Sequence, residues 1–210
     1  MKKYLESLLK DEKLIKKIQS KLPRLFQIAE LESSRAGKIG MEVGSLRERI
    51  IVALLIYKFG EANIQTEIPI TEAEIDVKVF DNPCSIKTIT GIKPKGIKLV
   101  WTVDADKALE FQNTYLPSCD VILVHINWNG EGGLYFISKE IQNEILNRLG
   151  RTAYFKLPKP GTNPRGVEIS DQAIDLITRN PEAIFIPIHW QKNNIKFHPF
   201  QRWIELWEQD

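Results

Sequence analysis

The chain has 210 residues, 43% of them hydrophobic and 27% charged, which is typical of one sizeable soluble folded domain. No run approaches the roughly 18 apolar residues of a membrane span, and acidic residues interrupt the lysine-containing N-terminus, which excludes a signal-peptide pattern. The net charge of +2 excludes no class of partner, and Cys84 and Cys119 lack metal-ligand spacing, so we expect reduced core cysteines in a cytoplasmic protein.

The first part of the chain is predicted to be helical. Apolar residues recur near helical spacing over residues 4–32, and Pro23 is expected to divide this region into two helices. A stretch with three glycines follows at 33–44. The next predicted helix has Ser45 as its N-cap and ends at Gly60, and its apolar run indicates burial against a sheet.

The rest of the chain alternates strand-like and helical segments. Strands are predicted near 64–70, 74–80, 84–90, 97–103, 119–128, 133–137 and 183–190, and helices over 104–115, 139–149 and 170–179. Trp203 and Trp207, four residues apart, are expected to anchor the last helix to the core. This order predicts a mixed α/β fold in which helices flank a central sheet. No glycine-rich phosphate loop opens any of the predicted helices, which argues against a Rossmann or P-loop nucleotide site.

Asp76 and Lys87 are predicted to lie close together. They fall on two adjacent strand-like runs, and the Asp-Asn-Pro turn at 81–83 can fold one run back on the other. A carboxylate that holds a divalent metal, with a lysine that steadies a water or a phosphate, is a common arrangement for phosphodiester cleavage. The spacing alone is weak, because an Asp and a Lys separated by ten residues often occur by chance.

Glu48 lies on the apolar stripe of the helix that precedes these strands. A lone carboxylate there must be satisfied, since burying it unpaired is costly. One interpretation is a salt bridge to the neighbouring Arg47 or Arg49. The other is a metal-coordinating or water-orienting role beside Asp76.

Several segments together resemble a known nuclease superfamily. They are Gly44-Ser45-Leu46-Arg47-Glu48-Arg49, the helix end Lys58-Phe59-Gly60, Glu74-Ile75-Asp76 and Ser85-Ile86-Lys87. This set is similar to the PD-(D/E)xK nucleases, and the chain more narrowly resembles the ThaI family of type II restriction endonucleases. The stretches 26–30, 35–38 and 161–170 fit the same likeness. The resemblance implies a PD-(D/E)xK core over 41–210, including DNA-recognition loops, with an N-terminal helical region over 1–40.

The resemblance also implies roles for single residues. Asp76 takes the place of the motif aspartate, Lys87 that of the motif lysine, and Glu48 that of the helix glutamate. Asp76 and Glu48 would hold Mg²⁺. Ser85 departs from the pattern, which expects Asp or Glu there, and a hydroxyl binds a divalent ion more weakly than a carboxylate. Glu42 is a lesser candidate for the missing charge.

Basic segments predict where DNA would lie. Residues 82–103 and 151–167 each carry four Lys or Arg and no acid, which favours a nucleic-acid face, although solvated loops have the same composition. The candidate DNA contacts are Arg35, Lys38, Met41, Lys93, Lys95 and Arg165. Arg165 is favoured for base contact because arginine reads guanine bidentately. Met41 is either an apolar wedge between base steps or a staple for the following helix.

The resemblance implies a Mg²⁺-dependent homodimer that cuts double-stranded DNA at a short palindrome, GC-only and CGCG-like, leaving 5′-phosphate and 3′-hydroxyl ends. It would work in a prokaryotic cytoplasm beside a cognate DNA methyltransferase. Two alternatives stay open at this point. One is a structure-specific nuclease of the same superfamily, such as a Holliday-junction resolvase, and the other is a non-catalytic DNA-binding protein on a decayed core, which Ser85 keeps open.

Overall fold

The computed structural model describes residues 10–35, 37–72, 74–102, 104–158 and 166–209. Its centre is a six-stranded sheet with the strand order β11-β8-β7-β5-β4-β3. The strands are β3 (Ile64–Gln65), β4 (Val77–Val79), β5 (Asn82–Thr90), β7 (Asp120–Ile126), β8 (Gly130–Ile137) and β11 (Ile184–Trp190). The pair β5 and β7 is parallel and the other neighbours are antiparallel. The predicted mixed α/β fold is therefore confirmed.

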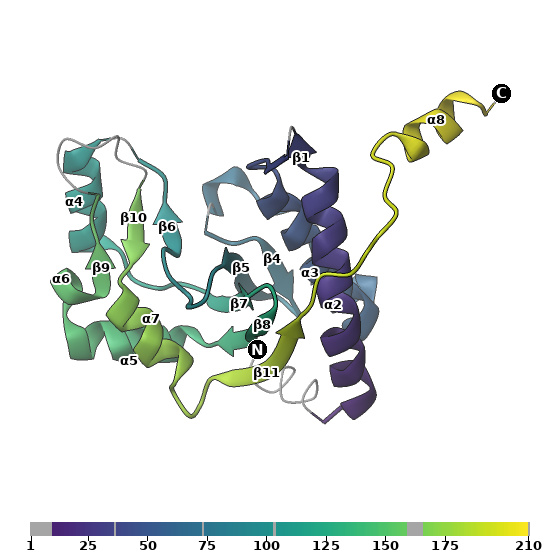
Figure 1. The fold of residues 1–210 in the computed structure, drawn as a ribbon. Coiled ribbons are helices and arrows are strands. Elements are labelled where there is room, and N and C mark those ends of the chain that lie inside the picture. The colour runs from purple at the N-terminus through teal and green to yellow at the C-terminus, as the bar shows by residue number, and fades with distance from the viewer. Residues whose placement is uncertain (1–9, 36, 73, 103, 159–165, 210) are drawn as a thin grey trace.

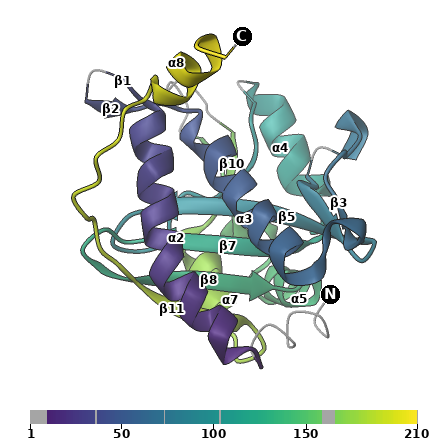
Figure 2. The same cartoon turned by 90° about the vertical axis from the view of Figure 1, so that its right-hand side faces the viewer.

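Helices cover both faces of this sheet (Figures 1 and 2). The helices α2 (Glu12–Glu32) and α3 (Val43–Phe59) lie on one face, and α5 (Lys139–Leu149) and α7 (Asp171–Thr178) lie on the other. Ile122 and Leu123 are consecutive residues of β7 that are each at most 1% exposed, and they belong to the two different cores. Because successive strand residues point to opposite faces, β7 is buried on both sides.

A second group of elements stands beside the sheet (Figure 1). It contains the small sheet β6 (Lys98–Val100), β10 (Val167–Ile169) and β9 (Phe155–Lys156), with the helices α4 (Ala105–Thr114) and α6 (Arg151–Tyr154). The hairpin of β1 (Ser34–Arg35) and β2 (Lys38–Ile39) follows α2, and the short 3₁₀ helices η1 (Glu61–Asn63) and η2 (Ile70–Glu72) flank β3. None of the helices that the structure describes is both long and apolar enough to cross a membrane.

The predicted break at Pro23 is wrong, because α2 continues through it. A proline inside a helix costs about 3 kcal/mol. Leu22 and Phe26 on either side of it are at most 3% exposed, and full burial of each such side chain contributes about 1.5–3 kcal/mol. The packing of α2 against the sheet and α3 therefore outweighs the local preference.

Several predicted boundaries also differ from the structure. The helix α3 begins at Val43 with Glu42 as N-cap, not at Ser45, although it does end at Gly60. The strand predicted over 64–70 is limited to β3, and the strand over 97–103 to β6. The helix predicted over 139–149 has the predicted limits.

The C-terminal helix α8 (Gln201–Trp207) does not pack on the core, so the anchoring role predicted for its tryptophans is wrong. Trp203 is 52% exposed and Trp207 is 89% exposed. An extended segment leads from β11 to α8, which projects away from the body of the molecule (Figure 1). The i, i+4 spacing indicates that the two rings share a helix face, but it does not say what that face contacts.

Candidate active site

The β4–β5 hairpin brings Asp76 beside Lys87. Val77 pairs with Cys84 and Val79 with Asn82, so the tight turn is Phe80-Asp81, one residue earlier than the predicted turn. Both turn residues have positive φ, 46° and 63°, as a two-residue hairpin turn requires. The Asp76 N–H donates to the Cys84 carbonyl oxygen at 3.0 Å, which continues the ladder by one residue. This register places Asp76 opposite Ser85.

The Asp76 carboxylate is held at one oxygen by two donors. Its Oδ2 accepts from the Ser85 hydroxyl at 2.9 Å and from the Ile86 N–H at 2.6 Å. The Lys87 Nζ lies 3.8 Å from the same oxygen. The aspartate and lysine side chains remain 20% and 27% exposed, so both are accessible from solvent while the carboxylate keeps a fixed orientation. The predicted proximity of Asp76 and Lys87 is confirmed.

Glu48 approaches this pair from α3. Burial raises the pKa of Glu48, the Asp76 carboxylate raises it further, and Lys87 and Arg49 act in the opposite direction. Arg47 forms its ion pair with Glu30, with Nη2 and Oε1 2.5 Å apart, and Glu48 forms no ion pair with any residue that the structure describes. The salt-bridge interpretation with Arg47 is thus wrong, and Glu48 is a partly buried acid next to a second acid.

The Ser85 hydroxyl is not exposed as a ligand to a metal at the cleft would be. Ser85 is 1% exposed, and its hydroxyl is engaged with Asp76. In the structure this residue orients the aspartate, which is a role that the sequence motif did not suggest.

Glu48 and Lys87 border a cleft of about 390 Å³ between the start of α3 and β6. Its lining includes Glu48, Lys87, Lys98 and Trp101. Trp101 is 63% exposed, and Lys98 Nζ lies 3.9 Å from the centre of its ring. Sequence analysis missed Trp101, although a tryptophan inside the basic, acid-free stretch 82–103 was a usable signal.

The predicted DNA contacts fall in three places. Arg35, Lys38 and Met41 lie on or just after the exposed β1–β2 hairpin, and Met41 is 87% exposed. Lys93 and Lys95 line a neighbouring groove beside α7, where Lys95 pairs with Asp171 at 3.1 Å, so the structure does not bring them into the cleft of Glu48 and Lys87. Arg165 lies outside the described residues.

The carboxylates of Asp76 and Glu48 suit a Mg²⁺ ion. Among the described residues no three His, Cys, Asp or Glu side chains converge as a metal site. Mg²⁺ in phosphate chemistry is commonly held by one or two carboxylates, with waters and substrate oxygens as the other ligands. The neighbouring Asp76 charge disfavours ionised Glu48, and a cation between the two would relieve that repulsion. The donor set therefore fits this metal.

Known proteins are similar to this chain over almost its whole length. The family model described as "Restriction endonuclease ThaI" matches residues 8–209. A solved structure described as "Restriction endonuclease in complex with substrate DNA" is 58% identical, has a TM-score of 0.91, and is matched over 97% of this chain and 98% of its own. A search of curated proteins gave no match. The chain belongs to the ThaI restriction endonuclease family.

Proposed function

We propose that the protein is a type II restriction endonuclease that cuts double-stranded DNA in the presence of Mg²⁺. The observation that carries this proposal is the convergence of Asp76, Lys87 and Glu48, of which Lys87 and Glu48 line one cleft. The family membership and the DNA complex of the similar solved structure support DNA as the substrate.

Each residue has a distinct part in the proposed reaction. Asp76 and Glu48 would hold the metal, which supplies positive charge to the scissile phosphate and to a bound water when it is present. Ser85 and the Ile86 N–H fix Asp76 through Oδ2, which leaves Oδ1 free of these two bonds. Lys87 positions the attacking water and offsets the negative charge that develops on the phosphate. In-line attack by water leaves a 5′-phosphate and a 3′-hydroxyl.

The surfaces around the cleft suit a DNA backbone. Lys98 and Trp101 stand at its edge, and Lys38 and Met41 lie near the start of α3. Lys98 would neutralise a phosphate, while Met41 would insert between base steps. We assign Arg35, Lys93, Lys95 and Arg165 to further phosphate or base contacts.

A palindromic site is cut most simply by two copies of the chain, since each active site then serves one strand. We therefore propose a homodimer. We propose a short GC-only target similar to CGCG, as the sequence resemblance implies, and a methyltransferase of matching specificity that would protect the host DNA.

The test is incubation of the protein with unmethylated genomic DNA in Mg²⁺ or EDTA, with Lys87→Ala as the matched variant. Discrete fragments that require both Mg²⁺ and Lys87 are expected, and sequencing of the ends gives the site and the end chemistry. Cleavage restricted to branched DNA would replace the proposal with a resolvase activity. Salt-dependent binding without any cleavage would replace it with a decayed nuclease core.

A further inference from the structure

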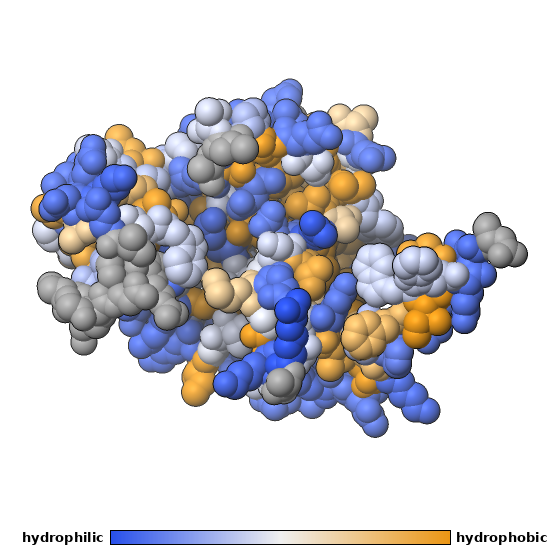
Figure 3. All heavy atoms as spheres, turned by 90° about the horizontal axis from the view of Figure 1, so that it is seen from above, coloured by the Kyte–Doolittle hydropathy of each residue, from blue (hydrophilic) through white to orange (hydrophobic). Residues whose placement is uncertain are grey.

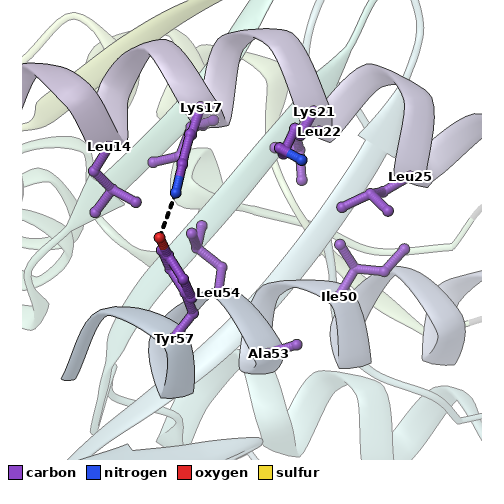
Figure 4. A pocket seen from close by; sticks show the side chains of 10 residues that line it. Leu14, Lys17, Lys21, Leu22, Leu25, Ile50, Ala53, Leu54 and Tyr57 are labelled. Carbon is purple, nitrogen blue, oxygen red and sulfur yellow. Dashed lines mark hydrogen bonds between the residues drawn. The ribbon is translucent and has the colours of Figure 1, made fainter. Parts of the chain in front are cut away.

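An apolar groove lies on the side of α3 that faces away from the cleft. The proposed reaction does not use this groove. The groove lies between α2 and α3 and has a volume of about 410 Å³ (Figure 4). Its apolar lining includes Leu25, exposed to 41%, and its edges carry Lys17, Lys21 and Tyr57. The Lys17 ammonium donates to the Tyr57 hydroxyl across the groove (Figure 4). The groove is thus apolar along its floor and positively charged at its rim.

The chain also carries an apolar helix, α8, whose residues are all exposed in the part of the chain that the structure describes. In α8 and its N-cap, Phe200, Trp203, Ile204 and Trp207 have the i, i+3, i+4, i+7 spacing of one helix face, and each is at least 42% exposed. The space-filling view shows this segment projecting from the body with apolar side chains on its surface (Figure 3). Such a stripe is the pattern by which a helix lies in an apolar groove.

We call residues 191–209, which follow β11 and include α8, the arm. The beginning of the arm is attached to the body of the molecule, and the rest is directed outward. The Gln27 side chain exchanges two hydrogen bonds with the Asn193 backbone, at 2.7 Å and 2.9 Å, and Lys192 pairs with Glu30 at 3.0 Å. These contacts attach the beginning of the arm to α2. Beyond them the arm leaves its own α2–α3 face (Figures 1 and 2).

We propose that α8 of one copy docks into the α2–α3 groove of a second copy, with the exchange made reciprocally. Charge complementarity selects this occupant, because α8 and its C-cap carry Glu205 and Glu208 against the single basic residue Arg202, and the groove presents Lys17 and Lys21. The apolar residues of one arm would cover on the order of 500 Å² of their own surface, so two arms and two grooves reach the roughly 1,200–2,000 Å² of a stable interface.

This inference rests on the proposed two-copy enzyme but not on its chemistry. Lys87→Ala, which disables cleavage, is therefore expected to keep the dimer mass in light scattering. Trp203→Ser/Trp207→Ser is expected to be a folded monomer.

Charge reversal provides the decisive test. Lys17→Glu/Lys21→Glu and Glu205→Lys/Glu208→Lys should each be monomeric alone, because arm and groove then carry like charges. An equimolar mixture should recover the dimer, since both arm–groove contacts of the mixed pair are again complementary. The control Lys107→Glu/Lys139→Glu changes two exposed lysines on the other face by the same charge and should stay dimeric.

Cross-linking identifies which copy supplies the arm. The native Cys84 and Cys119 are buried, so cysteines introduced at Ala53 and Leu206 will react selectively. A mixture of Ala53→Cys and Leu206→Cys proteins should give a cross-linked dimer, whereas Leu116→Cys in place of Ala53→Cys should not. A cross-link formed only within a chain that carries both cysteines would overturn the proposal in favour of self-docking. A dimer insensitive to charge reversal would overturn the arm contact alone, and a wild-type monomer on and off DNA would overturn the two-copy enzyme as well.

Discussion

The Ser85 hydroxyl donates a hydrogen bond of 2.9 Å to Asp76 Oδ2 where an acidic residue is expected by the nuclease motif. Ser85 is almost fully buried, so it acts on Asp76 and not directly on solvent or substrate. The bond and that of the Ile86 N–H together fix the carboxylate plane. Where the motif has a second acid, this chain therefore has Ser85, which positions the Asp76 carboxylate.

Ser85→Ala is expected to lower the cleavage rate by about 10- to 100-fold, because a hydrogen bond to a charged group contributes about 1.5–3 kcal/mol. Part of this loss should be recovered at higher Mg²⁺, since a poorly oriented Asp76 binds the metal less well. Ser85→Asp should not improve activity, because it places a second carboxylate against Asp76 in a buried position. Cleavage rates of wild type and both variants, measured over a range of Mg²⁺ concentrations, test the positioning role of Ser85. A Ser85→Asp enzyme that is faster than wild type would contradict this role.

Glu48→Gln is expected to stabilise the metal-free protein at neutral pH. The raised pKa of Glu48 means that the folded protein binds this proton more tightly than the unfolded chain does, so ionisation of Glu48 costs stability as pH rises through the folded pKa. The melting temperature of the variant should exceed that of wild type at pH 7, and the difference should vanish below pH 4.5, the ordinary value for this group. Mg²⁺ should raise the melting temperature of wild type more than that of the variant. Equal melting temperatures at every pH would show that Glu48 is not desolvated.

Sequence patterns predicted the proximity of Asp76 and Lys87 because it depends on local structure. Alternation in 75–79 and a turn before Cys84 suffice to pair Asp76 with the strand of Lys87. The position of Glu48 followed from its helix face, but whether Arg47 would neutralise it depended on Glu30, which is 17 residues away and 4% exposed. Long-range pairing of this kind leaves no periodic signal in a single sequence.

Tertiary contacts also decided the elements that were mispredicted. Pro23 stays helical because its neighbours are buried by the sheet and α3, and α8 stands free although its composition resembles that of a core helix. An apolar face indicates that something covers it, but the sequence does not tell whether the cover belongs to the same copy.

Met41→Ala is expected to weaken DNA binding without changing stability. Met41 is 87% exposed, so its loss should alter the free energy of unfolding by less than about 0.5 kcal/mol. If the side chain is buried between base steps, affinity should fall about 10- to 100-fold, which corresponds to the 1.5–3 kcal/mol of burying such a residue. Fluorescence of pyrrolo-cytosine, which can replace a cytosine of the GC-only target, should report unstacking by wild type and not by the variant. Unchanged affinity would remove Met41 from the DNA interface, while a lower melting temperature would favour the staple.

Arg47→Met is expected to destabilise the fold by about 3–5 kcal/mol, because it leaves the buried Glu30 carboxylate without its main partner. Arg47 also donates to the Thr90 hydroxyl at 3.2 Å, so it ties α3, next to Glu48, to both α2 and the end of β5. The Trp128 indole N–H and Lys192 still contact Glu30, which should keep the variant folded at low temperature. Arg47→Met/Glu30→Gln should recover part of the loss, since the uncompensated charge is gone. Urea unfolding of the three proteins measures the coupling, and a double variant as unstable as Arg47→Met would show that α3 is held by the packing of the Arg47 side chain and not by the ion pair.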